Sequence, residues 1–100
     1  MNILALDLGC TSRNPTKTYA TILNTDTGAI ERTSVPTTAK DLIALIRAHR
    51  PDRVVMEITR GTGWVVDLCR GIRVPEIQVV NPNDPAWKNG EYTSAPPGLR

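Results

Sequence analysis

Hydrophobic and polar positions follow strand spacing over the first third of the chain. Residues 3–6 form a continuous apolar run that ends at Asp7, which is the pattern of a central strand buried on both faces. Residues 17–24 and 29–35 are rich in β-branched side chains, and the turn residues 25–28 separate them. This part of the sequence therefore predicts an antiparallel meander of three strands.

The spacing of the apolar residues changes after this meander. Over residues 42–49 they recur at helical intervals, Thr38 can cap such a helix together with Asp41, and Pro51 stops it. Residues 53–57 then have the composition of a short strand. Because the chain must cross over the sheet to reach it, we expect this strand to lie beside the first strand and parallel to it.

A second helix and a fifth strand complete the predicted domain. The helix is expected after residues 61–63, with Gly71 as its C-terminal cap, and residues 77–80 predict the strand. The chain beyond this strand contains four of the eight prolines and shows no apolar period. The expected organisation is one α/β domain with a mixed five-stranded sheet over residues 1–82, followed by an irregular tail over residues 83–100.

Composition narrows the class of protein without assigning a function. A chain of 100 residues with 40% hydrophobic content suits one small globular domain. Its net charge of +2 permits a nucleic-acid partner but does not argue for one. Cys10 and Cys69 are far apart and only one histidine is present, so neither a disulfide framework nor a zinc site is predicted. The sequence shows no signal peptide or membrane span, and we expect a cytoplasmic protein without a membrane partner.

Candidate chemistry lies at the ends of two predicted strands. Asp7 ends the first strand and Glu57 ends the fourth. Since adjacent strands are about 4.8 Å apart, both carboxylates reach the same edge of the predicted sheet. Two such carboxylates can hold one Mg²⁺ or Mn²⁺ ion, and ions of this kind support phosphodiester displacement. The alternative is that Asp7 only caps the turn at Gly9.

Three segments of the sequence together resemble the DEDD transposases of the insertion-sequence-110 family. They are Leu6-Asp7-Leu8-Gly9, residues 54–64 (VVMEITRGTGW) and Val79-Val80-Asn81-Pro82. The resemblance covers about residues 1 to 89 and implies a ribonuclease-H-like (RuvC-like) fold in a DNA transposase or site-specific recombinase. It assigns Asp7 and Glu57 as catalytic ligands of Mg²⁺ or Mn²⁺. It also implies DNA and a structured guide RNA as partners, and an oligomer in the intact family.

The sequence departs from this family after the Asn-Pro loop. The family's two remaining acids lie on a later helix, in a Thr-Asp-x-x-Asp-Ala type segment, where this chain has Lys88-Asn89-Gly90-Glu91-Tyr92. The family's C-terminal domain, with its serine nucleophile, is also missing. We therefore expect a fold truncated before its last helix, weak or absent metal binding, and no activity of the chain alone. Its status as an enzyme stays open, and a full-length transposase is a further expected partner.

Other functions remain open at this stage. A nucleotide-binding domain of the sugar-kinase, actin and Hsp70 type also has an Asp-x-Gly after its first strand, although that fold needs two related lobes. A relative of Holliday-junction resolvases and pre-16S rRNA nucleases would share the sheet. A non-catalytic remnant would interfere with a full-length partner.

Basic residues do not decide between these functions. Arg47, Arg50 and Arg53 cluster near the predicted end of a helix, where the dipole favours cations, so we expect a solvated face rather than a DNA contact. Residues 11–13 and Lys17 can approach a nucleic-acid backbone, but ordinary loop polarity explains them equally well.

Overall fold

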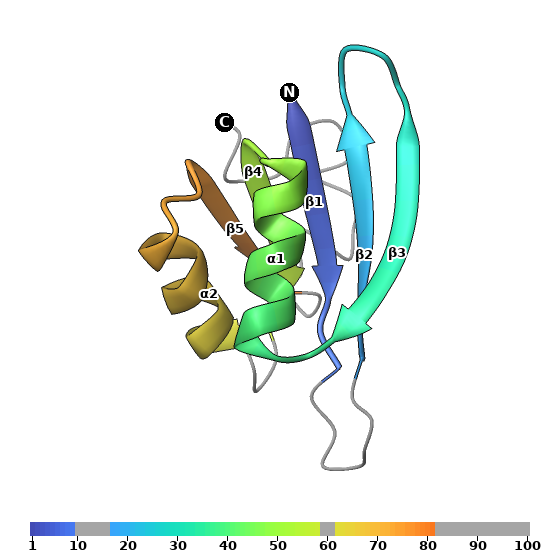
Figure 1. The fold of residues 1–100 in the computed structure, drawn as a ribbon. Coiled ribbons are helices and arrows are strands. Elements are labelled where there is room, and N and C mark those ends of the chain that lie inside the picture. Colours follow the sequence, from blue (N-terminus) through green and yellow to red (C-terminus); the bar gives the residue numbers. More distant parts are fainter. Residues whose placement is uncertain (10–16, 59–61, 82–100) are drawn as a thin grey trace.

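A computed structural model of the chain describes residues 1–9, 17–58 and 62–81. The strands of this part form one mixed five-stranded sheet in the order β3-β2-β1-β4-β5, and both helices lie on one face of it (Figure 1). Neither helix of the described part is long and apolar enough to cross a bilayer. The elements in chain order are β1 (Asn2–Asp7), β2 (Lys17–Asn24), β3 (Ile30–Pro36), α1 (Ala39–His49), β4 (Arg53–Glu57), α2 (Thr62–Gly71) and β5 (Glu76–Val80).

Strand β1 lies at the centre of the sheet and pairs in both directions. It is antiparallel to β2, which is antiparallel to β3, and this is the predicted meander. On its other side β1 is parallel to β4, with Leu4 opposite Val54 and Leu6 opposite Met56. Strand β4 is in turn parallel to β5. The carboxyl ends of β1, β4 and β5 therefore meet at one edge of the sheet, as the crossover argument predicts.

The core lies between the sheet and the two helices. Alternate residues of β1, β2 and β4 point toward the helices and are buried. The expectation that β1 is buried on both faces is wrong, because α1 and α2 cover the same face and leave Ala5 and Asp7 exposed on the other. The buried apolar residues are Leu4, Leu6, Leu8, Ala20, Ile22, Leu42, Leu45, Ile46, Val54, Met56, Val65 and Cys69.

Local sequence signals correctly predict the N-terminal cap of α1, but not the residue that ends α2. Thr38 caps α1 as predicted, because its hydroxyl oxygen accepts a hydrogen bond from the backbone N–H of Asp41 at 3.2 Å. Arg50 ends this helix in the left-handed conformation, with φ 45°. The prediction of a cap at Gly71 is wrong. Gly71 is still helical, and the left-handed residue after α2 is Arg73, with φ 62°.

Arg53 is buried rather than solvated, which corrects its assignment to a solvated basic face. Only 8% of the residue is exposed, and its Nη2 donates a hydrogen bond to Glu76 Oε2 at 2.8 Å. The reason is sheet register, since Arg53 opens β4 directly opposite Glu76 in β5. Arg47 and Arg50 are exposed, as predicted.

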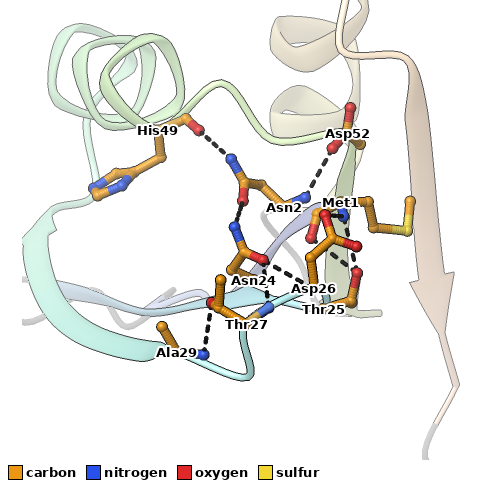
Figure 2. A network of polar contacts seen from close by, with 9 residues as sticks. All are labelled: Met1, Asn2, Asn24, Thr25, Asp26, Thr27, Ala29, His49 and Asp52. Carbon is orange, nitrogen blue, oxygen red and sulfur yellow. Dashed lines mark hydrogen bonds and ion pairs between the residues drawn. The ribbon is translucent and has the colours of Figure 1, made fainter.

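A network of polar contacts fixes the edge of the sheet at the amino end of β1 (Figure 2). The backbone N–H of Asn2 donates to Asp52 Oδ2 at 2.8 Å, and its side-chain amide donates to the carbonyl of His49 at 3.4 Å. Asn24 Nδ2 donates to Asn2 Oδ1 at 3.1 Å, so the turn after β2 joins the same network. These contacts tie β1 to the connection between α1 and β4, and they support the β1–β4 register on which the opposite edge depends.

Cys69 is a free thiol in the core and is fully buried. Burial removes water from around the thiolate and raises the pKa of this thiol to about 11. Cys69 is therefore a small apolar packing residue at neutral pH. Cys10 lies outside the described residues.

Candidate active site

The two candidate acids line one hollow on the sheet face opposite the helices. Asp7 follows buried Leu6 and Glu57 follows buried Met56, so strand alternation turns both acids away from the core. Leu6 and Met56 are register partners, and the next step along both strands brings Asp7 beside Glu57. The hollow has a volume of about 440 Å³ and is lined by Ala5, Leu6, Asp7, Tyr19, Thr21, Val55, Met56, Glu57 and Val80. The sequence-based placement of both acids at one edge agrees with this geometry, and their role as metal ligands stays a prediction.

Close backbone contacts hold the ends of the two strands in place. A Cβ atom on Gly9 would overlap the backbone carbonyl oxygen of Lys17, so only glycine allows the chain to approach β2 this closely after Asp7. On the other strand, the Thr62 hydroxyl donates to the carbonyl of Glu57 at 3.0 Å. The N–H of Ile58 donates to the carbonyl of Val80 at 2.8 Å, which extends the β4–β5 pairing past Glu57. These contacts restrict the backbone positions of both acids.

Both carboxylates are exposed and have no partner of opposite charge within the part of the chain that the structure describes. Two like charges one strand spacing apart repel each other, and a cation between them relieves that repulsion. Carboxylate oxygens are also the ligands that Mg²⁺ and Mn²⁺ prefer. Among the described residues, no histidine, cysteine or further acid joins Asp7 and Glu57 as a third possible ligand. The arrangement suits a weakly held, hydrated divalent ion.

Tyr19 belongs to this site, although sequence reasoning gave it only a strand-forming role. It is the register partner of Asp7 in β2, and 59% of it is exposed. The alternation of residues 17–24 carries the signal, because buried Thr18 and Ala20 on either side of Tyr19 place its ring on the same face as Asp7. An exposed aromatic ring beside two acids offers a flat surface on which a base can stack.

Comparison with known proteins assigns the fold. No protein-family model matches the sequence, and no curated protein is similar to it. The structure is similar to the Fowlpox virus resolvase, solved with its substrate Holliday junction DNA, with TM-score 0.59 and 14% sequence identity over 94% of this chain and 70% of that chain. It is also similar to the catalytic core domain of BIV integrase, with TM-score 0.50 and 16% identity over 91% of this chain and 62% of that chain. The chain has a ribonuclease-H-like fold.

The ribonuclease-H-like fold confirms the predicted fold class, including the mixed sheet and the parallel β1–β4 pair. At these low identities the likeness concerns the fold and does not transfer residue roles. The predicted irregular tail over residues 83–100 and the loop residues 11–13 lie outside the described residues.

Proposed function

We propose that this chain is the N-terminal part of a DNA transposase or site-specific recombinase related to the insertion-sequence-110 family. The observation that carries the proposal is that Asp7 and Glu57, which have no oppositely charged partner among the described residues, end adjacent parallel strands of a ribonuclease-H-like sheet. The three sequence segments that resemble the family include both residues. The domain occupies residues 1–82 in this proposal, and residues 83–100 form its tail.

Asp7 and Glu57 would bind one Mg²⁺ or Mn²⁺ ion. Mg²⁺ in proteins is commonly held by one or two carboxylates, with water and substrate phosphate as the other ligands, so the residues present fit such an ion. When bound, the ion supplies charge stabilisation for the attacking and leaving oxygens of a phosphodiester. The protein's own contribution is to orient the two carboxylates through the β1–β4 register and to offer Tyr19 as a stacking surface.

Because the described residues bring only two carboxylates to this site, the proposal expects weak metal binding and no cleavage of DNA by the chain alone. Phosphodiester displacement requires an ion held in a fixed geometry, and two ligands leave it mobile. In this proposal the chain acts in the cytoplasm, and its activity depends on further acids from a full-length transposase, within an oligomer that holds DNA and a structured guide RNA.

A thermal shift experiment with Mn²⁺ tests the metal site. For a dissociation constant on the order of 1 mM, an ion concentration of about 10 mM stabilises the fold by about 1.4 kcal/mol, which raises Tm by about 6 to 11 °C. Asp7→Asn and Glu57→Gln should each abolish the shift. Asp67→Asn removes an exposed carboxylate from α2 and should retain it. A shift of the same size in all four proteins would refute the site.

A Holliday-junction resolvase is the second candidate function. The likeness to the Fowlpox virus resolvase, which covers 70% of that chain, favours it. A preference for a four-way junction over a linear duplex would distinguish this candidate. Binding of a junction at least tenfold tighter than a linear duplex of equal length would favour the resolvase (about 1.4 kcal/mol).

A further inference from the structure

A second hollow lies at the opposite end of the strands from Asp7 and Glu57. Its lining residues come from the C-terminal end of α1, the turn into β4 and the connection that leads from α2 into β5. Its volume is about 450 Å³, which is within the range of ligand pockets, and apolar side chains form much of its wall. The lining residues are Ile46, Arg47, Arg50, Pro51, Asp52, Ile72, Arg73, Val74 and Pro75.

Three arginines give this hollow a positive charge that no ion pair within the described part of the chain neutralises. Arg47, Arg50 and Arg73 are exposed, and none of them has a carboxylate within ion-pair distance among the described residues. The one acid in the lining, Asp52, already accepts a hydrogen bond from the N–H of Asn2 at 2.8 Å. Arg53 shows the contrast, because it is buried and paired with Glu76. The hollow therefore offers three available guanidinium groups to an anion.

Two of these arginines stand where the backbone favours glycine. Arg50 and Arg73 are the non-glycine residues with positive φ in the described part of the chain, at 45° and 62°. Glycine adopts this conformation after a helix at no steric cost, whereas a residue with a Cβ is strained there. The helix dipole favours a cation near a helix C-terminus, but Arg47 and Arg70 already lie in the last turns in ordinary helical conformation. Both positions therefore carry a cation at a backbone conformation that glycine would adopt more easily, and both line the same hollow.

We infer that this hollow binds the phosphodiester backbone of a nucleic-acid strand through Arg47, Arg50 and Arg73. The inference rests on the proposed function, because it takes the chain to act on nucleic acid. A guanidinium group matches phosphate with two parallel N–H···O hydrogen bonds, and its charge is independent of pH in the physiological range. Because the hollow lies at the far end of the strands from the two acids, the strand segment held here is distinct from the one presented to Asp7 and Glu57.

Fluorescence anisotropy with EDTA present measures this contact apart from any metal. The probes are a labelled DNA strand of about 20 nucleotides, longer than the usual site of one small domain, the RNA of the same sequence, and the DNA duplex. The test variant is Arg50→Gly with Arg73→Gly, and the matched control is Lys40→Gln with Arg70→Gln. The control removes the same charge from exposed helix positions outside the hollow.

The test variant should bind its preferred probe about tenfold or more weakly than the control does, because it loses two charge-assisted contacts to phosphate that the control keeps. The slope of log K against log salt should fall by about 1.4 for single strands, or about 1.8 for the duplex. The Tm of the test variant should be unchanged or higher. The probe that shows these losses identifies the source of the phosphates as single-stranded DNA, RNA or duplex.

Equal binding by the test variant and the control overturns the inference and leaves the proposed function standing. The same holds if the test variant has a lower Tm but unchanged binding, because the arginines are then structural. The inference is also overturned if the test variant binds all three probes as the control does while inorganic phosphate alone raises the Tm of the wild type. A wild-type chain that binds none of the three probes overturns both the inference and the proposed function.

Discussion

Replacing Glu76 with alanine should leave Arg53 as a buried guanidinium without its carboxylate partner. The two side chains meet at 2.8 Å, and their exposed fractions are 10% for Arg53 and 40% for Glu76. Among the described residues, the Nε of Arg53 has no hydrogen-bond partner, so Glu76 is the acceptor that satisfies this guanidinium group there. Breaking a fully buried pair costs about 3 to 5 kcal/mol, whereas an exposed pair contributes at most about 1 kcal/mol. Water reaches the Glu76 side of this pair, so we expect Glu76→Ala to cost about 2 kcal/mol.

Urea unfolding and thermal melting measure this cost. A loss of about 2 kcal/mol corresponds to a Tm lower by about 8 to 16 °C in a domain of this size. The double variant Arg53→Met/Glu76→Leu should recover to within about 1 kcal/mol of the wild type, because a buried ion pair offers little net advantage over apolar residues. Glu31→Ala is the control, since its pair with His49 spans 4.0 Å and the Glu31 side chain is exposed. The reasoning fails if Glu76→Ala costs no more than the control, or if the double variant is as unstable as the single one.

Three further predictions follow from contacts elsewhere in the molecule. Asn2→Ala removes two side-chain hydrogen bonds, to Asn24 and His49, and should lower the free energy of unfolding by about 1 to 3 kcal/mol; an unchanged urea midpoint would contradict this. The pKa of Cys69 rises from 9.0 to about 11 on folding. The contribution of the buried thiol to the free energy of unfolding is therefore complete below pH 9 and is lost as the pH rises toward 11. The Tm of Cys69→Val should therefore fall less than the Tm of the wild type between about pH 8 and about pH 10.5. Parallel curves of Tm against pH would count against a raised pKa of Cys69. The chain alone should not cleave supercoiled or branched DNA with Mg²⁺ or Mn²⁺; cleavage that disappears in Asp7→Asn would prove that expectation wrong.

The sequence predicts well those features that depend on neighbouring residues. The cap of α1 joins Thr38 to a residue three positions away, and the β2–β3 turn is encoded in consecutive residues, so both were predictable. The placement of Asp7 beside Glu57 required only the crossover rule, which applies to almost all parallel pairs.

Features that depend on distant partners were not predictable in this way. The partner of Arg53 is twenty-three positions away, and nothing in its immediate sequence distinguishes it from the exposed Arg50. The expectation that β1 is buried on both faces was wrong, because an apolar run does not reveal which faces of the sheet the helices cover. Tyr19 was missed at the site because the pairing of β2 with β1 sets its neighbour, which local composition does not specify.

The parallel pairing of β1 with β4 also has a consequence for the kinetics of folding. It joins segments offset by 50 positions, whereas β2 and β3 close over a short turn. Closing the longer segment costs more chain entropy before its contacts form, so the β2–β3 hairpin and α1 should form before the two acids meet. If the proposed cation binds between Asp7 and Glu57, it would stabilise a contact that this order of events places after the transition state. Such an ion should leave the refolding rate unchanged and slow unfolding.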